Sequence, residues 1–221
     1  MIRRAVVVPH PPLLVPGLSP GPDPELATLR EACVSAAGRL GPVWTAIGAD
    51  AQDQVIGPDA AGSFRGYGVD EQVALSAGGT PRVLPLPALI AGWLREQAGA
   101  ESVETRLVAR GTTAAECARL GSELTGDLLI LGDGSNRHGP RSPGSEDERA
   151  PAFDDAVAKA LAKADTQALL DIDPGLADEL GAGGRVPWQV LAGTGGNWHG
   201  ELLYSAAPFG VMYHVAVWEF E

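Results

Sequence analysis

The sequence is poor in cysteine and has no dense run of basic residues. Its two cysteines, Cys33 and Cys117, stand apart inside helix-like stretches, and no CxxC pair occurs. This spacing gives no support to a zinc ribbon, a redox motif or a disulfide framework, and two reduced thiols are typical of a cytosolic protein. The formal net charge of −12 argues against binding to nucleic acid or to anionic membranes, because both require cationic side chains.

Long apolar runs and several catalytic motifs are also missing. No segment approaches the roughly 18 apolar residues that span a bilayer, and the short run at 5–8 ends in prolines, unlike a signal peptide. There is no GxSxG, P-loop or HExxH motif, and the glycines at 193–196 lack the full dinucleotide fingerprint. We therefore expect a cytoplasmic protein that has no membrane partner and uses none of these chemistries.

Strand-like and helix-like segments alternate along the chain. Apolar or alternating patterns predict strands at 5–8, 43–47, 73–75, 103–109, 127–131, 201–206 and 210–219. Helical spacing predicts helices at 24–40, 84–98, 114–125, 154–164, 166–172 and 176–180, whereas 187–192 fits either state. We expect long loops at 57–68 and 140–150. The alternation indicates one three-layer α/β domain over 1–221, in which the last two strands can pair antiparallel.

His10 follows the first predicted strand, between prolines that stiffen the backbone. Pro9 ends that strand because proline lacks the N–H that the next ladder bond needs. Ligands of open α/β sheets bind beyond the carboxyl ends of strands. The His10 imidazole is therefore a candidate metal ligand or general base, with a packed histidine in a proline-rich turn as an equal alternative.

A second polar segment, at 132–139, follows the predicted strand at 127–131, so it should share a rim of the sheet with His10. Its small residues would let a substrate or metal approach the backbone, and Asp133, Ser135 and His138 are candidate proton-handling groups. The alternative is a polar turn whose aspartate and serine bond nearby N–H groups. Two histidines after two strand ends favour a site.

A third candidate is Asp59, which follows the apolar pair at 55–56. A carboxylate beyond a strand end could complete the set of two histidines and one carboxylate that non-haem iron uses, although an aspartate that starts a turn is the more common case. His199 and His214 are weaker candidates, predicted in a surface turn and packed inside a strand. We expect four tryptophans in the core: Trp44, Trp93, Trp188 and Trp218.

Several segments together resemble the class III extradiol ring-cleavage dioxygenase family. They are VPHPPLLVPGL at the start, ILGDGSNRH in the middle, FDDAVAKALAKAD after it and the C-terminal LLYSAAPFGVMYHVAVWE. This superfamily contains the catalytic B subunit of protocatechuate 4,5-dioxygenase and the Memo proteins. The resemblance implies a mixed central β-sheet flanked by helices. It also implies Fe(II) held by two histidines and a glutamate, with a further histidine that transfers protons while a catechol ring opens.

Carried onto this chain, the resemblance makes His10 the first metal ligand and His138 the proton-transferring histidine. Asp59 stands where the second metal histidine is expected. The third ligand falls near 179–184, where Glu179 is close but off register and Ala182 or Gly183 is at the expected place.

An open non-haem iron site relies on a full triad. The incomplete set of metal-ligating residues therefore favours a metal-free protein whose cleft binds a small molecule or a partner protein. The alternative is an active Fe(II)-dependent dioxygenase with His10, Asp59 and Glu179 on the metal. The cofactor is accordingly Fe(II) or none, and the resemblance also implies a homo-oligomer.

Overall fold

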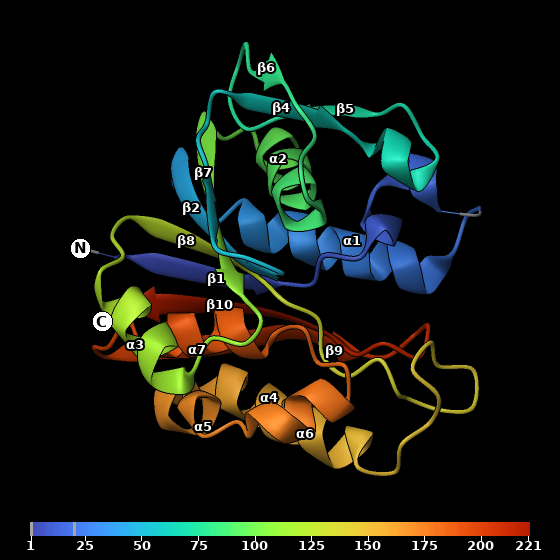
Figure 1. Ribbon diagram of the computed structural model, residues 1–221, viewed down its shortest axis with the longest axis vertical. Helices are drawn as coiled ribbons and strands as arrows, with labels where there is room; N and C mark the ends of the chain where they lie inside the picture. The colour runs from blue at the N-terminus through green and yellow to red at the C-terminus, as the bar shows by residue number, and fades with distance from the viewer. Residues whose placement is uncertain (1, 20) are drawn as a thin grey trace.

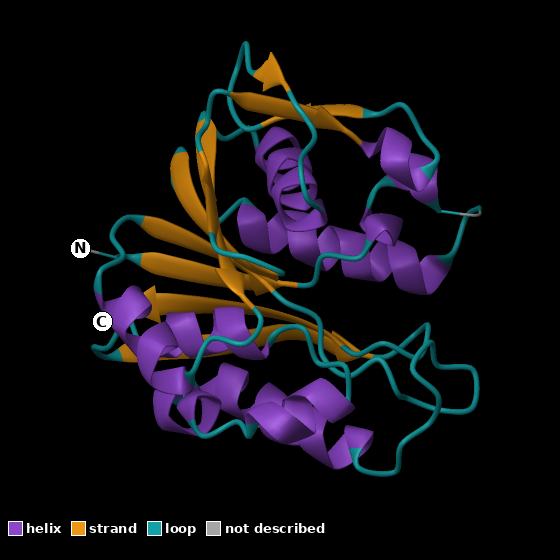
Figure 2. Cartoon of the chain, in the orientation of Figure 1, coloured by secondary structure: helices purple, strands orange, loops and turns teal. Residues whose placement is uncertain are grey.

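The computed structural model describes residues 2–19 and 21–221. A seven-stranded sheet runs through the molecule between two layers of helices (Figure 1; Figure 2). In spatial order its strands are β3 (Gln54–Ile56), β7 (Ser102–Ala109), β2 (Val43–Asp50), β8 (Asp127–Leu131), β1 (Arg4–Val8), β10 (Tyr213–Phe220) and β9 (Trp198–Ala206).

The sheet is mixed. Strands β7, β2, β8 and β1 are parallel, whereas β3 pairs antiparallel with β7, and β10 with both β1 and β9. The predicted three-layer α/β class, with its mixed central sheet and antiparallel final pair, is therefore confirmed. Because β7, β2, β8 and β1 are parallel neighbours, their carboxyl ends lie together at one rim of the sheet.

Helices cover both faces of the sheet (Figure 1). One face carries α1 (Pro24–Ala37) and α2 (Leu86–Ala98). The other carries α3 (Ala114–Ser122), α4 (Ala150–Lys163), α5 (Thr166–Leu170), α6 (Pro174–Glu179) and α7 (Arg185–Ala192). Segment 187–192, which fitted either state, is thus helical. Among the described residues, none of the helices combines the length and apolarity required to cross a bilayer.

A small second sheet packs against α2, and it corrects the predicted loop at 57–68. That segment contains β4 (Ala60–Ser63), which pairs with β5 (Gln72–Ala74) and β6 (Thr80–Pro81), and a short 3-10 helix at Phe64–Tyr67. An added Cβ at Gly62 would lie 2.9 Å from the side chain of Leu89 on α2. The strand is made of small residues because α2 packs tightly on it, and this hides the alternation that predicts a strand.

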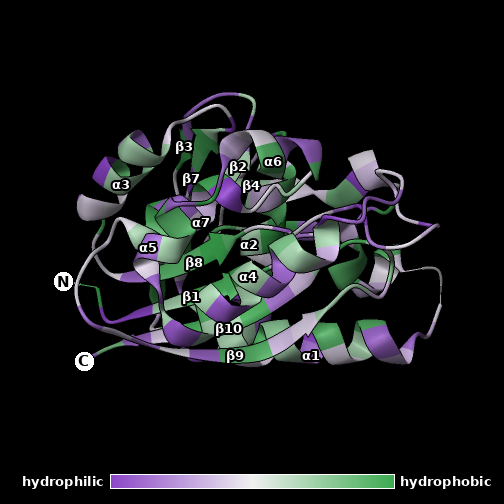
Figure 3. Ribbon diagram, turned by 90° about the horizontal axis from the view of Figure 1, so that it is seen from below, coloured by the Kyte–Doolittle hydropathy of each residue, from purple (hydrophilic) through white to green (hydrophobic). Residues whose placement is uncertain are grey.

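The hydrophobic core consists of two layers, one on each face of the sheet. Val6 and Val8 of β1 point into the layer under α1 and α2, while Ala5 and Val7 point into the opposite one. Strands β1 and β8 are hydrophobic throughout their middle (Figure 3), as expected for parallel strands buried on both faces. The four tryptophans predicted in the core are all buried.

Local signals place two helix starts correctly. Asp23 accepts hydrogen bonds from the N–H groups of Glu25 and Leu26, and Pro24 begins α1. Thr113 and Glu116 form the predicted capping box of α3. The prediction for His199 was wrong, because this residue lies in β9 rather than in a turn.

Candidate functional site

A cavity of about 610 Å³ lies at the carboxyl ends of the four parallel strands. We call it the strand-end cavity. Its wall includes one residue at or just after the end of each strand: His10, Ala49, Arg110 and Asp133. Residues of other segments complete it, and they are Pro11, Pro12, Leu86, Asn136, Pro143, Ala177, Asp178, Gly181, Ala182, Gly183, Val211 and Tyr213. This is the position at which open α/β sheets bind ligands.

His10 and Asp133 meet in this cavity, as predicted from their places after β1 and β8. The backbone N–H of His10 donates to Asp133 Oδ1 at 2.9 Å, and the His10 Nδ1 atom lies 3.8 Å from Asp133 Oδ2. That Nδ1 atom is buried and has no hydrogen-bond partner among the described residues. A buried polar atom left without a partner costs free energy, so this position favours a bound polar group.

Asn136 provides a second unsatisfied atom in the same wall. Its Oδ1 is buried without a partner among the described residues. Its backbone is fixed by two hydrogen bonds, from Asn136 N–H to Leu180 O at 3.1 Å and from Gly144 N–H to Asn136 O at 2.9 Å. The carboxamide therefore stands on a firmly held loop.

Charged and phenolic groups complete the cavity wall. Arg110 is exposed, and no described residue forms an ion pair with its guanidinium group. Burial, together with the nearby charge of Asp133, raises the pKa of the Tyr213 phenol. Tyr213 therefore remains a neutral hydroxyl group at physiological pH, whereas Arg110 supplies a positive charge to the wall.

His138 belongs to a different polar cluster. Its Nε2 atom lies 2.6 Å from Oδ2 of Asp154, a fully buried carboxylate on α4. The Nε2 atom of buried His214 lies 3.6 Å from the other oxygen, and Ser205 Oγ is 3.0 Å from His214 Nδ1. The Ser135 N–H contacts both carboxylate oxygens at 3.2 Å. The Ser135 N–H and the His138 ring thus give the buried Asp154 side chain its hydrogen-bond partners.

His138 and Ser135 do not line the strand-end cavity. His138 lines a separate hollow of about 530 Å³ with Arg141, Phe209 and their neighbours. The Ser135 hydroxyl is buried and donates to Leu180 O at 2.9 Å, so it ties the loop to the end of α6. Of the predicted proton-handling groups, only Asp133 shares a cavity with His10.

Asp59 and Glu179 lie away from His10, and each is satisfied locally. Asp59 is the third residue of a turn in which the Ala60 N–H donates to Gly57 O, and its carboxylate pairs with Arg82 at 3.0 Å. Glu179, near the end of α6, pairs with Arg149 at 2.7 Å. Their side chains are 72% and 61% exposed. The three predicted metal ligands are thus not assembled at one point.

The residues present therefore do not fit the three-ligand iron site that the resemblance implies. The unsatisfied Nδ1 atom of His10 is one available donor, but the other two predicted donors are occupied by arginines. Within the described residues, no group of three or more His, Cys, Asp or Glu side chains is arranged to hold a metal ion. The two cysteines offer no thiolate either, because burial raises the pKa of both thiols.

Sequence reasoning missed Asp154, Arg110 and Asn136. The first had a usable signal, since Asp154, Val157 and Leu161 have the i, i+3, i+7 spacing of one helix face, and a carboxylate on a buried face needs a partner. Arg110 follows a predicted strand end, as His10 does. Nothing in the local pattern separates Asn136 from an ordinary turn residue.

Comparisons with known proteins support only the fold. No family model matches the chain, and no curated protein matches it. Among solved structures it is similar to the crystal structure of the uncharacterized protein JW3007 from Escherichia coli K12, with a TM-score of 0.61 and 13% sequence identity. The similarity covers 98% of this chain and 99% of that chain. At this identity the likeness concerns the three-layer α/β arrangement alone.

Proposed function

We propose that the chain binds a small polar molecule in the strand-end cavity with its own side chains, without a metal and without cleaving a ring. The carrying observation is that His10 and Asn136 line one cavity, and that each has a buried side-chain atom without a hydrogen-bond partner among the described residues, namely His10 Nδ1 and Asn136 Oδ1. Its volume lies within the roughly 300–1,000 Å³ that small-molecule sites occupy. Iron-dependent ring opening remains a prediction of the family resemblance alone.

The chemistry of the wall narrows the class of ligand. Asn136 Oδ1 can only accept a hydrogen bond, so the ligand must offer a hydroxyl or amino group. Arg110 favours a carboxylate, which the guanidinium group can bind through two hydrogen bonds. Apolar side chains take up the rest of the molecule, and they include Pro11, Leu86 and Val211. A small hydroxylated carboxylic acid combines these features.

Calorimetric titration with tartrate, citrate, salicylate and gallate, each beside its methyl ester, tests this proposal. We expect at least one acid to bind and its ester to bind about tenfold more weakly, because the ester cannot pair with Arg110. Arg110→Met should weaken binding of the acid to about the same extent. Arg141→Met is the matched control, since Arg141 lines the other hollow.

Two results would overturn the proposal. One is that none of the acids binds, or that both arginine variants weaken binding equally. The other comes from an anaerobic titration with Fe(II): stoichiometric binding that His10→Ala abolishes would show that this histidine serves a metal.

A further inference from the structure

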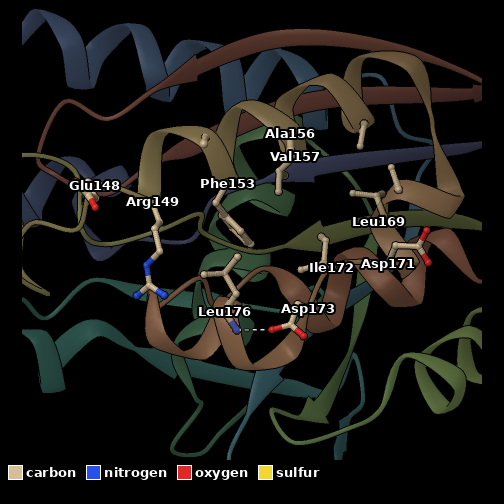
Figure 4. Close-up of a pocket in the computed structure, with 13 residues that line it drawn as sticks. Glu148, Arg149, Phe153, Ala156, Val157, Leu169, Asp171, Ile172, Asp173 and Leu176 are labelled. Carbon is tan, nitrogen blue, oxygen red and sulfur yellow. Dashed lines mark hydrogen bonds between the residues drawn. The ribbon is translucent and has the colours of Figure 1, made fainter.

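An apolar groove of about 750 Å³ lies between α4 on one side and α5 and α6 on the other, and we call it the α4–α6 groove (Figure 4). It shares no lining residue with the strand-end cavity. Phe153 and Val157 reach into it from α4, and Ile172 and Leu176 face them from the opposite side (Figure 4). Leu169 closes the floor and is fully buried.

The α4–α6 groove has a rim of exposed residues. Its rim carries exposed alanines, namely Ala152, Ala156 and Ala168. Such short side chains allow the backbone of another molecule to come close. The lining residues of α4 extend from Ala152 to Ala160, which is about 12 Å along a helix at 1.5 Å per residue. Two turns of a docked helix, with apolar residues at i, i+3, i+4 and i+7, need about the same length.

Both ends of the groove are negatively charged. At one end, Glu148 stands beside Arg149, whose guanidinium group is already paired with Asp147 and Glu179 at 2.7 Å each. Arg149 holds the pKa of Asp147 well below its usual range, so two carboxylates pair with this one positive charge, and Glu148 adds a third carboxylate without a salt bridge to a described residue.

At the other end, two aspartates make only neutral hydrogen bonds. Asp171 accepts from the Gln167 amide at 2.8 Å, and Asp173 caps α6 by accepting from the Leu176 N–H at 2.7 Å. Neither carboxylate pairs with a basic side chain of the described residues. An apolar floor between two acidic ends is complementary to an apolar segment that carries basic residues at both ends.

We propose that the α4–α6 groove docks an amphipathic helix of a partner protein, with an apolar stripe flanked at both ends by lysine or arginine. The apolar face fills the groove, and the flanking cations meet the acidic ends. Charge complementarity of this kind selects the partner and speeds its encounter. The net charge of −12 on the whole chain acts in the same direction.

The test uses a fluorescent helical peptide with leucines at i, i+3, i+4 and i+7, two lysines at each end and alanine elsewhere, titrated with the full chain. A second peptide carries glutamates in place of the lysines. We expect the lysine peptide to bind and the glutamate peptide to bind at least about tenfold more weakly.

Three variants separate docking in the groove from general attraction to an acidic protein. Ala156→Glu adds negative charge but places a carboxylate over the apolar floor, so groove docking should weaken about tenfold. Asp171→Asn should weaken it about threefold by removing one end charge. Asp155→Asn is the matched control on an exposed residue of α4 that does not line the groove, and it should bind like the wild type.

Unchanged or tighter binding by Ala156→Glu would overturn the proposal, since it would mean that charge alone attracts the peptide. If Asp171→Asn and Asp155→Asn weakened peptide binding equally, the proposal would also be overturned. Sedimentation velocity covers the remaining case: if the wild type dimerises and Ala156→Glu is monomeric, the groove holds a second copy of the chain and no partner helix.

Discussion

The Nε2 atom of His138 lies 2.6 Å from Oδ2 of Asp154, and no part of the Asp154 side chain is exposed to solvent. This contact ties the loop after β8 to α4. We predict that Asp154→Ala destabilises the protein by about 3 kcal/mol, because it leaves the Ser135 N–H and the His138 ring without their buried partner. Urea unfolding measures this loss. Asp155→Ala, one residue along on the exposed face, should change stability by less than about 0.5 kcal/mol, and similar losses in both variants would contradict the prediction.

Two adjacent glycines beside the strand-end cavity should differ sharply in their tolerance of alanine. An added Cβ at Gly184 would collide with the Trp188 ring, whereas one at Gly183 meets no atom within 4 Å. Gly184→Ala should cost about 2 kcal/mol through overpacking, and Gly183→Ala should be neutral. Thermal unfolding of the pair tests this, and the same melting temperature for both would refute the steric explanation.

The capping box of α3 predicts a measurable pH effect. The hydroxyl of Thr113, and then its N–H, hold the pKa of Glu116 below its usual range. The stabilisation is therefore present above the ordinary pKa of a glutamate and is lost as the pH falls through the lowered value. In Thr113→Val, carboxyl NMR titration should show the pKa of Glu116 rising towards its ordinary value. An unchanged titration would mean that the hydroxyl plays no part.

Both thiols should be unreactive in the native protein. Burial raises the pKa of Cys33 strongly and that of Cys117 to about 11, and both side chains are buried. Because the thiolate is the reactive form, Ellman's reagent at mildly alkaline pH should label neither cysteine until the protein is unfolded, and then label both. Rapid labelling of the native chain would contradict this.

The rim of the sheet was predictable from the sequence because one physical rule governs it. Pro9 ends β1, a buried apolar run precedes Gly132, and parallel strands bring their carboxyl ends together. That rule predicts that segment 132–139 shares one rim with His10, and the 2.9 Å hydrogen bond from the His10 N–H confirms this for Asp133.

Asp59 is predicted from its place after an apolar pair, and Glu179 only from a family motif; neither kind of signal reveals the partner of a side chain. Asp59 and Glu179 are paired with Arg82 and Arg149, which lie 23 and 30 residues away in the chain. No local pattern predicts such pairs. In the same way, the burial of Asp154 decides that His138 turns towards α4, although His138 is only five residues from Asp133.

If His10 contacts a small polar ligand directly, the nitrogen signals of its side chain respond to that ligand, and side-chain NMR of the four histidines detects the response. With labelled imidazole nitrogens, the acid that binds best in calorimetry is added to the metal-free protein. We predict that the Nδ1 signal of His10 shifts at saturation while exposed His199 stays unchanged. A His10 signal that does not move at saturation, or moves only after Fe(II) is added, would show that this histidine does not contact the small ligand.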